Sequence, residues 1–240
     1  MRPTITIHLP EGLDQGSLAR LLSDLDGART SEASAWILRG ASGGRFCRGM
    51  AFGELAHDHA EDGLRRFAEV LDSLRRAPRP TVAVVEGEAI GGGLGLAAAC
   101  DKLIATPAAR FALPEALFGI LPGVVLPVVL ERLTPQRARL LALDGEARDA
   151  EWAERAGLVD AVVPTQALDA ELRRAVRSLG RVGDARVRGL REWCDQARAL
   201  PIAEALVRGA AVTGALLADS AVQGALARFT AEGIPPWVEA

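Results

Sequence analysis

A run of three glycines, Gly91 to Gly93, is the feature of this chain best suited to chemistry. The run follows the apolar segment 81–85 and precedes the small-residue segment 96–100, which predicts a strand, a glycine turn and a helix start. A helix start presents unpaired N–H groups and the positive end of the peptide dipoles. Glycine lets a ligand oxygen approach that backbone closely. Such a turn can bind a phosphate or stabilise an oxyanion during reaction at a carbonyl; a turn that serves only close packing is the alternative.

The spacing of these glycines excludes two phosphate-binding motifs. A dinucleotide-binding fingerprint that starts at Gly91 needs a third glycine at position 96, which holds Leu96. A P-loop that runs from Gly87 to Gly92 needs a lysine next, where the chain has Gly93. The oxyanion and packing interpretations remain.

A second strand with a glycine turn, and one carboxylate, add to this picture. The segment 35–39 predicts a buried strand, and the glycine-rich segment 41–52 follows it. Further along, the stretch 110–123 places Glu115 among apolar residues. Apolar surroundings raise the pKa of a carboxyl group, which suits proton transfer near neutral pH. An exposed acid at a helix start, where the dipole favours it, is the alternative.

Alternating strands and helices are expected to position these segments. Apolar periodicity predicts strands over 4–8, 35–39, 81–85, 102–105 and 158–163, and helices over 17–26, 61–76, 127–133, 135–143 and most of 168–229. This alternation implies an α/β fold with a largely parallel, layered core, whose crossover connections the helices supply.

The order of the motifs resembles that of the enoyl-CoA hydratase/isomerase (crotonase) superfamily. The likeness rests on Phe46-Cys47-x-Gly49, Gly91-Gly92-Gly93 followed by Cys100-Asp101, Phe111-x-x-Pro114-Glu115-x-x-x-Gly119-x-x-Pro122-Gly123, and Ala153-Glu154-Arg155-Ala156-Gly157-Leu158-Val159-Asp160. It implies a crotonase-like spiral of ββα units over residues 1–180. It also implies a C-terminal helical region over 181–240 that is used in trimer assembly.

Within that superfamily, the chain is most similar to the enoyl hydratase-like enzymes of polyketide β-branching. This narrower likeness rests on Gly-Gly-Leu-Gly at 92–95, Leu-Phe-Gly-x-x-Pro at 117–122 with Val-Leu-Pro at 125–127, and Gly-Ile-Pro-Pro-Trp at 233–237. It implies a carrier-protein-bound substrate of the 3-hydroxy-3-methylglutaryl type.

The resemblance implies a role for several residues. The backbone N–H groups of Met50 and Gly92 would hold the oxygen of a thioester while an enolate forms. Glu115 matches the family's second acid/base glutamate and would transfer the proton.

The resemblance also implies a substrate-binding surface. Arg48, Gly91 and Gly119 would contact the substrate, and the Arg48 guanidinium is a candidate to reach a phosphate. Coenzyme A or phosphopantetheine would be the substrate handle, without a cofactor or metal.

The chain departs from the family pattern at two positions. Ordinary enoyl-CoA hydratases carry another glutamate where this chain has Gly95, which puts the hydration step of fatty-acid β-oxidation in doubt. The polyketide subgroup usually has an aspartate after the oxyanion residue, where this chain has Ala51. Glu54 or Asp58 are candidates to compensate, although each also fits a solvated charge.

These features favour an acyl-thioester enzyme that dehydrates a 3-hydroxyacyl thioester, or hydrates the product reversibly. A double-bond isomerase is one alternative, because a single carboxylate can remove a proton and return it to a neighbouring carbon. A non-catalytic crotonase-fold assembly partner is another. A decarboxylase fits less well, because the lysine and histidine groups of the related polyketide decarboxylases have no match here.

Composition limits the partners and the compartment. The net charge of −3 argues against a nucleic-acid binder. Three cysteines without paired spacing indicate neither a disulfide framework nor a zinc site, which favours the cytoplasm. The N-terminus lacks a secretory apolar core. The longest apolar run, 119–130, is broken by prolines and glycine and is too short to span a membrane.

The expected partners are acyl-CoA or an acyl carrier protein, and further copies of the chain in a homotrimer or a dimer of trimers. An acidic carrier protein could dock on Arg65, Arg66, Arg75 and Arg76, although these side chains also fit a solvated helix face. The sequence His57-Asp58-His59 is a weak metal or proton-relay candidate, because residues two apart do not share a helix face. His8 is expected to be structural.

Overall fold

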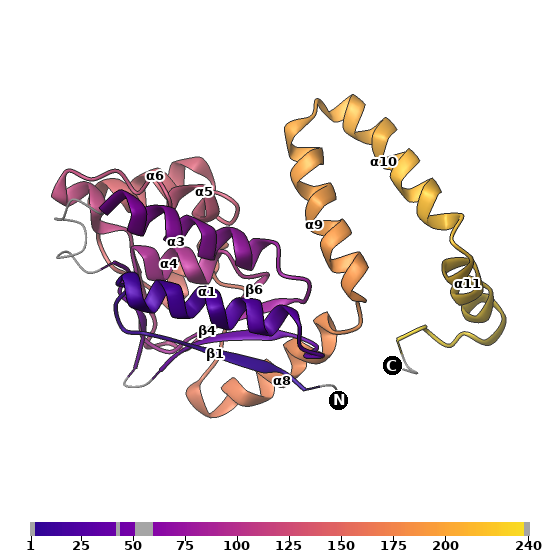
Figure 1. Cartoon of the computed structure of the whole chain (residues 1–240), viewed down its shortest axis with the longest axis horizontal. Helices are drawn as coiled ribbons and strands as arrows, with labels where there is room; N and C mark the ends of the chain where they lie inside the picture. Colours follow the sequence, from indigo (N-terminus) through magenta and orange to yellow (C-terminus); the bar gives the residue numbers. More distant parts are fainter. Residues whose placement is uncertain (1–2, 42–43, 51–59, 238–240) are drawn as a thin grey trace. The chain divides into compact units, whose positions relative to one another are not determined.

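The computed structural model describes residues 3–41, 44–50 and 60–237. The chain divides into two compact units, Met1–Gly180 and Arg181–Ala240. The first unit contains strands in two sheets with helices around them, and the second contains helices (Figure 1). The predicted α/β class is therefore confirmed.

The larger sheet of the first unit has five parallel strands. Their order is β1-β2-β4-β6-β9, and the strands are β1 (Ile5–Leu9), β2 (Trp36–Gly40), β4 (Thr81–Val85), β6 (Lys102–Ala105) and β9 (Ala161–Val162). Every residue of β4, the central strand, is buried, as expected for a parallel sheet covered on both faces.

The smaller sheet contains short strands that periodicity did not reveal. Its order is β3-β5-β7-β8, with β3 (Arg45–Cys47), β5 (Glu88–Ile90), β7 (Arg110–Ala112) and β8 (Arg148–Asp149). Strands β3, β5 and β7 each follow a strand of the larger sheet, which produces the repeated ββ step of the spiral. The prediction that strand 81–85 leads directly into the glycine turn is wrong, because β5 lies between them.

Helices cover both faces of the larger sheet (Figure 1). One face packs in the main core with α1 (Gln15–Arg29), α3 (Ala60–Arg75) and α4 (Gly92–Ala98). The other face packs against α8 (Leu168–Leu179) through buried Leu168, Ala175 and Val176. Helix α1 begins at a capping box, in which the Ser17 N–H donates to Asp14 Oδ1 at 2.7 Å.

The remaining elements of this unit follow β7. They are η1 (Pro114–Phe118), α5 (Leu126–Val129), α6 (Pro135–Asp144), α7 (Ala150–Ala156) and η2 (Thr165–Ala167). Two predicted elements are shorter in the structure. The predicted helix 127–133 continues beyond α5 only as turns, in which the N–H groups of Glu131 and Arg132 donate three residues back. The predicted strand 158–163 pairs only as β9, because the residues before it form the turn after α7.

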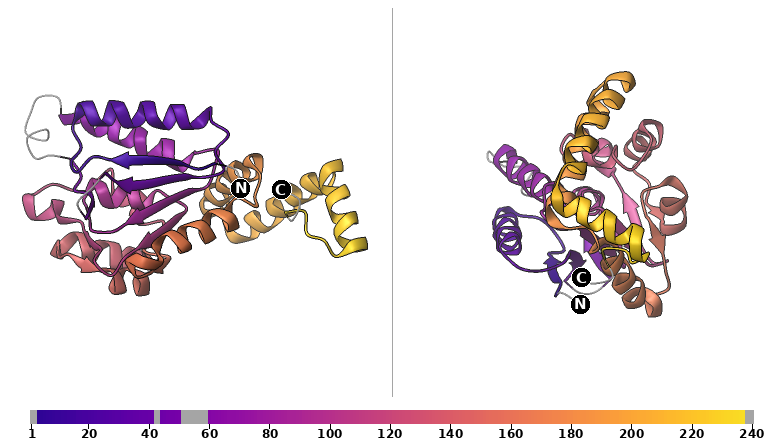
Figure 2. Two further views of the ribbon diagram at one scale, coloured as in Figure 1. Left: turned by 90° about the horizontal axis from the view of Figure 1, so that it is seen from below. Right: turned by 90° about the vertical axis from the view of Figure 1, so that its right-hand side faces the viewer.

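The second unit contains three long helices, as the pattern after residue 168 predicts. They are α9 (Asp184–Ala199), α10 (Ile202–Leu217) and α11 (Ser220–Glu232) (Figure 2). Large apolar side chains stay exposed on all three, including Leu190, Leu206 and Phe229. No single described helix has the length and apolarity to cross a bilayer; only α10 and α11 taken together do, and they meet at an 81° bend.

Candidate active site

Two glycine turns meet at the backbone inside the first unit. Gly49, which follows β3, has φ +76°, and a Cβ built on it would lie 2.6 Å from the Gly92 nitrogen. A Cβ on Gly92 would in turn lie 3.1 Å from the Gly49 Cα. Only a residue without a side chain permits this approach and the left-handed φ. The two expected oxyanion donors, Met50 and Gly92, therefore lie on segments that are in contact.

Backbone pairing fixes the first of these turns. The Arg48 N–H donates to the Glu11 carbonyl at 2.7 Å, and the Leu13 N–H donates to the Gly49 carbonyl at 2.8 Å. Neither bond uses the Met50 N–H. Within the described part of the chain, the Met50 N–H has no acceptor. No described acceptor therefore competes with a ligand for it.

The second turn begins helix α4. The Gly91 N–H donates to the Ala112 carbonyl of β7 at 2.9 Å, which ties the turn to the smaller sheet. Gly92 is the first residue of α4, and its N–H has no acceptor among residues 3–41, 44–50 and 60–237. The first N–H groups of a helix lack partners within the helix, so this one can also serve a ligand.

A guanidinium holds the opposite end of α4. Arg132 Nε donates to the Ala98 carbonyl at 3.1 Å, and Nη2 donates to the Cys100 carbonyl at 2.5 Å. Its Nη1 reaches the Leu158 carbonyl and Asp160 Oδ2, both at 3.1 Å. A cation at a helix C-terminus is favourable to the helix dipole. Arg132 therefore fixes the helix whose first N–H is the candidate donor.

Glu115 faces the glycine turn from η1. A Cβ built on Gly91 would lie 2.8 Å from Glu115 Oε1, so the carboxyl group lies directly against that turn. The other oxygen, Oε2, is buried and makes no hydrogen bond within the described residues. Burial raises the pKa of Glu115. The interpretation of Glu115 as an acid in apolar surroundings agrees with this burial. The alternative, an acid at a helix start, also agrees in part, because Glu115 occupies the first turn of a 3₁₀ helix.

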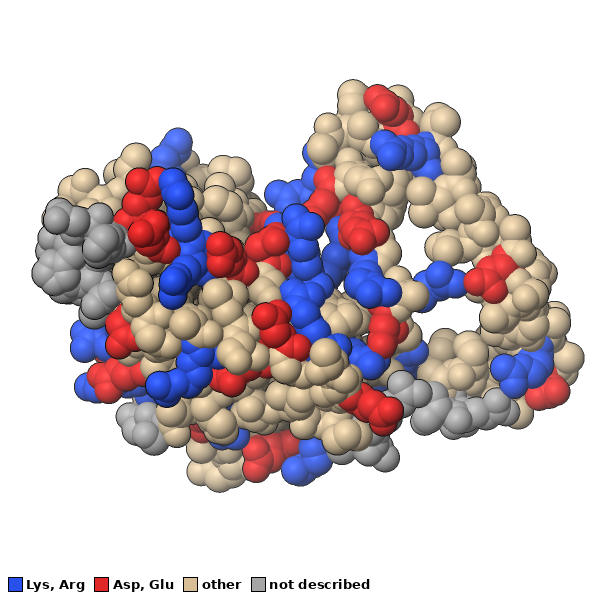
Figure 3. Space-filling model, viewed as in Figure 1, with Lys and Arg blue, Asp and Glu red and all other residues tan. Residues whose placement is uncertain are grey.

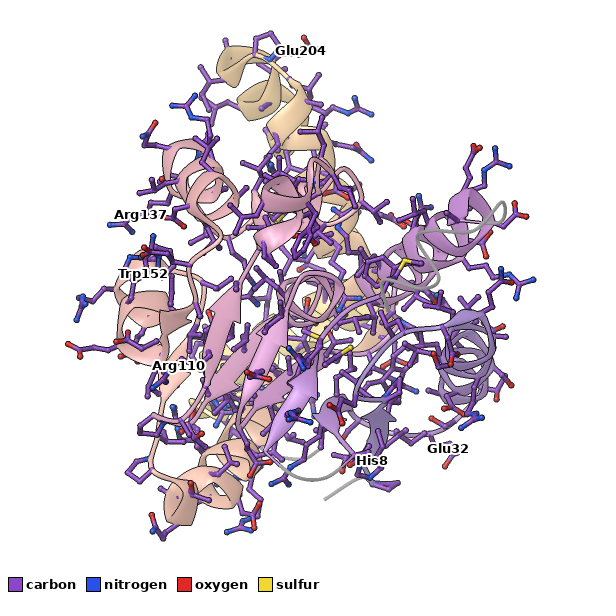
Figure 4. The ribbon with its side chains drawn as sticks, turned by 90° about the vertical axis from the view of Figure 1, so that its left-hand side faces the viewer. His8, Glu32, Arg110, Arg137, Trp152 and Glu204 are labelled. Atoms are coloured by element: carbon purple, nitrogen blue, oxygen red, sulfur yellow. The ribbon has the colours of Figure 1, made fainter. Side chains whose placement is uncertain are left out.

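One cavity of about 920 Å³ unites most of the predicted site. Its lining includes Glu115, Met50, Gly92, Gly91 and Arg48. Strand β7, which begins at Arg110 (Figure 4), leads directly to the wall that bears Glu115. The fold thus brings three segments that are distant in the sequence to one concave surface.

Gly119 does not share that surface. It is absent from the described lining of the cavity, and a Cβ built on it would meet nothing within 4 Å. Its φ of +75° ends η1, and its N–H donates to the Ala116 carbonyl at 3.0 Å. Gly119 therefore shapes the turn after Glu115, and its contact with substrate stays a prediction.

Charged side chains gather at one end of the cavity. Arg48 Nε lies 3.6 Å from Glu88 Oε2, and the same oxygen lies 3.6 Å from Arg45 Nε. Arg45 also pairs with Glu11, which lines the cavity together with Arg48. The side chain of Arg48 is 54% exposed, so it can reach a ligand at the rim.

Apolar side chains lie next to the position of the missing second glutamate. A Cβ on Gly95 would lie 3.4 Å from both methyl groups of Val125 and 3.6 Å from Phe67 Cζ. The sequence predicts Phe67 only as part of the helix over 61–76 and does not place it in the site. Its ring also lies 3.2 Å from the built Cβ of Gly92, so it supports the donor helix directly.

Other predicted features lie elsewhere or outside the described residues. Ala51, Glu54 and the sequence His57-Asp58-His59 are among the residues that the structure does not describe. His8 is exposed on β1 (Figure 4). Among the described residues, no group of three His, Cys, Asp or Glu side chains could hold a metal ion.

The arginines proposed for carrier docking are mostly paired within the chain. Arg65, Arg75 and Arg76 bind Glu61, Glu131 and Asp72 at 2.7, 2.8 and 2.8 Å. Figure 3 shows basic and acidic side chains interspersed over the displayed face of the first unit. A solvated, ion-paired helix face therefore accounts for them.

Comparison with known proteins agrees with this arrangement. Residues 4–240 match the model of the enoyl-CoA hydratase/isomerase family. A probable enoyl-CoA hydratase of Mycobacterium bovis, echA8, is 31% identical over 85% of this chain and 81% of its own length. The bacillaene synthase dehydratase PksH of Bacillus subtilis is 30% identical over 65% of this chain and 63% of its own length.

Solved structures lead to the same assignment. An enoyl-CoA hydratase of Mycobacterium smegmatis superposes with a TM-score of 0.87 at 26% identity, over 98% of this chain and 94% of that one. An enoyl-CoA hydratase/isomerase of Marinobacter aquaeolei gives a TM-score of 0.84 at 25% identity, over 99% and 96%. The predicted crotonase-like fold is thus confirmed, and the chain is an enzyme of the enoyl-CoA hydratase/isomerase family.

Proposed function

We propose that the cavity binds an acyl thioester and stabilises the enolate that forms when a proton leaves its acyl chain. The observation that carries this proposal is the backbone contact between Gly49 and Gly92, beside a buried carboxyl oxygen of Glu115 that has no hydrogen-bond partner among the described residues. Met50, Gly92 and Glu115, which the proposal assigns as donors and base, all line one cavity.

The oxyanion would accept hydrogen bonds from the N–H groups of Met50 and Gly92. Both are main-chain donors fixed by glycine turns, so they need little reorganisation as charge develops on the thioester oxygen. One such donor contributes about 3–4 kcal/mol of transition-state stabilisation in other enzymes. The positive end of α4, which begins at Gly92, adds to this stabilisation.

Glu115 would act as the proton carrier. Its carboxylate removes the α-proton of the substrate, and the electron pair passes into the enolate. The same group then delivers this proton to the departing β-hydroxyl, which leaves as water and yields the 2-enoyl thioester. The raised pKa of Glu115 suits both halves of this exchange near neutral pH.

Dehydration of a 3-hydroxyacyl thioester, or the reverse hydration, is the favoured reaction. A coenzyme A or phosphopantetheine thiol would be the handle, and Arg48 at the rim is a candidate contact for its phosphates. The narrower expectation of a carrier-bound 3-hydroxy-3-methylglutaryl group in polyketide biosynthesis has support from the 30% identity to the bacillaene synthase dehydratase.

A double-bond isomerase is the second candidate. Gly95 favours it, because this position supplies no second acid and its described neighbours, Val125 and Phe67, are apolar. A lone Glu115 could remove a proton from the α-carbon of a 3-enoyl thioester and return it to the γ-carbon.

The test compares Glu115→Gln with Glu69→Gln, an exposed glutamate of α3 outside the cavity lining. Both are assayed with a 3-hydroxyacyl and a 3-enoyl thioester. We expect Glu115→Gln to lower turnover by roughly 10²–10⁴-fold and Glu69→Gln to leave it unchanged.

The two substrates separate the candidate reactions. A dominant 3-enoyl rate without dehydration would assign the isomerase. Thioester binding without turnover, unaltered in Glu115→Gln, would assign a non-catalytic partner and remove Glu115 from the role.

We further propose that the second unit assembles the chain into a trimer, as the resemblance implies. The exposed Leu190, Leu206 and Phe229 on its three helices support this role, because they offer apolar surface for burial between copies. Analytical ultracentrifugation is expected to show three chains or a multiple of three. A monomer that keeps full activity would contradict it.

A further inference from the structure

Glu88 lies beside Arg48, the side chain that the proposed function offers to the phosphates of the substrate handle. From this contact we infer that Glu88 determines how tightly the enzyme holds a phosphate-bearing handle, because a phosphate that binds Arg48 competes with the Glu88 carboxylate. The inference rests on the proposed acyl-thioester function and adds a residue that sets its specificity for coenzyme A or phosphopantetheine.

Two neighbouring strands of the smaller sheet fix the position of Glu88. It is the first residue of β5, and it pairs in register with Arg45, the first residue of β3. Strand β3 ends at Cys47, so Arg48 follows directly, and its N–H donates to the Glu11 carbonyl at 2.7 Å. The backbone that carries Glu88 and Arg48 is therefore fixed by hydrogen bonds, and a ligand needs to displace only side chains.

The two arginines of this group differ in how fully they are engaged. Arg45 pairs with Glu11, and its Nε also lies 3.6 Å from Glu88 Oε2. Arg48 Nε lies 3.6 Å from the same Glu88 oxygen, which is longer than a normal hydrogen bond. Within the described part of the chain, the Arg48 guanidinium makes no hydrogen bond. Arg48 is therefore the guanidinium that a phosphate can engage more readily.

The cavity presents Arg48 to a ligand together with the charge of Glu88. Arg48 is the one cation among the described residues that line the cavity. A guanidinium can donate two parallel hydrogen bonds to a phosphate, which is a closer contact than the present pair with Glu88. The phosphate would then lie near the Glu88 carboxylate, and the two negative charges repel each other. The phosphate thus gains Arg48 only against Glu88.

The exposure of the pair determines the size and the kind of effect. The side chains of Arg48 and Glu88 are 54% and 40% exposed, and charges in contact with water interact weakly. Removing the Glu88 charge should therefore change the affinity for the handle by about three- to fivefold. Glu88 is outside the described lining of the cavity, so we expect the effect on binding and not on the chemical step.

Glu88→Gln tests the inference in the full-length enzyme, because it removes the charge and keeps the size of the side chain. Glu151→Gln is the matched control, since Glu151 is also an exposed glutamate paired with an arginine, Arg155, but lies outside the described lining. Both variants are assayed with 3-hydroxyhexanoyl-CoA and with the same acyl group on pantetheine, which carries no phosphate.

The expected result is a change in KM that depends on the phosphates. Glu88→Gln should lower KM for the CoA thioester by about three- to fivefold at unchanged kcat. It should leave both constants for the pantetheine thioester unaltered, which also shows that the variant is folded. Glu151→Gln should change neither substrate. An unchanged KM for the CoA thioester in Glu88→Gln, or an equal fall for both handles, would overturn the inference.

The Arg48→Gln background shows whether the effect passes through Arg48. Without that guanidinium, Glu88 has nothing to compete for, so adding Glu88→Gln should give no further fall in KM for the CoA thioester. A fall of the same size with and without Arg48 would assign the effect to the general charge of the rim and overturn the inference.

Calorimetric titration with coenzyme A separates the inference from the proposed function. We expect coenzyme A to bind Glu88→Gln about three- to fivefold more tightly than wild type, and pantetheine to bind both alike. Equal affinity of the two proteins for coenzyme A, or no binding to either, would overturn the inference. Turnover of the pantetheine thioester would still support the proposed function, whereas no turnover of any 3-hydroxyacyl or 3-enoyl thioester would contradict it.

Discussion

Replacing Gly49 by alanine is the most direct test of the proposed oxyanion pair. The new Cβ would lie 2.6 Å from the Gly92 nitrogen and 3.0 Å from the Ile90 carbonyl oxygen. Real Cβ atoms do not approach backbone atoms so closely, and neither neighbour is the end of a flexible side chain. The two turns must therefore separate, which moves one donor relative to the other.

Two contributions to the effect can be estimated. Holding alanine at the φ of +76° found at Gly49 costs about 1–2 kcal/mol of folding free energy. Misplacing one of the two donors costs about 3–4 kcal/mol of transition-state stabilisation, which lowers kcat by roughly 10²–10³-fold. The loss of activity should therefore exceed what the loss of stability explains.

Gly44→Ala is the matched control for this prediction. Gly44 has nearly the same φ, +74°, but a Cβ on it would meet nothing within 4 Å. Both variants are compared by urea unfolding and by kcat for a thioester substrate. We expect similar backbone strain in both and a large fall in kcat only in Gly49→Ala. Wild-type kcat in folded Gly49→Ala would refute the reasoning that the contact sets the donor geometry.

Two further predictions concern Glu115 and Gly95. Burial raises the pKa of Glu115 in the folded chain, so its protonation stabilises the fold fully below the unfolded pKa of about 4.3, and this stability is lost as pH rises through the folded pKa. Urea unfolding should therefore show Glu115→Gln more stable than wild type near neutral pH but not at low pH; a gap independent of pH would contradict this. Gly95→Glu combined with Val125→Ala places a carboxyl group beside Phe67, where the resemblance expects a second acid, and hydration of a 2-enoyl thioester should rise at least about tenfold over Val125→Ala alone. An unchanged hydration rate would show that the missing acid does not limit this reaction.

The long elements of the fold could be predicted from the sequence, and the short ones could not. The strand 81–85 and the helix 61–76 have apolar patterns long enough to define one structure, and the structure has β4 and α3 within one residue of those bounds. Strands β3, β5 and β7 have only three residues each, too few for any period to emerge. Their pairing depends on the larger sheet beside them.

The residues of the candidate site also divide into those that the sequence could reveal and those that it could not. Glu115 could be singled out because a carboxylate is conspicuous in an apolar stretch, and the glycines because their spacing is unusual. Val125 and Phe67 could not be assigned to the site, because an apolar side chain near the cavity has the same local pattern as one in the core. Only the folded backbone shows that both converge on Gly95.

The Arg132 clamp has a consequence for the order in which the enzyme matures during synthesis. Both glycine turns are translated by residue 93, but the guanidinium that anchors α4 comes later, and its partners Leu158 and Asp160 later still. A nascent chain that stops before Arg132 has both donor segments without this anchor. The anchoring of α4 by Arg132 is therefore completed only after residue 160 has emerged from the ribosome.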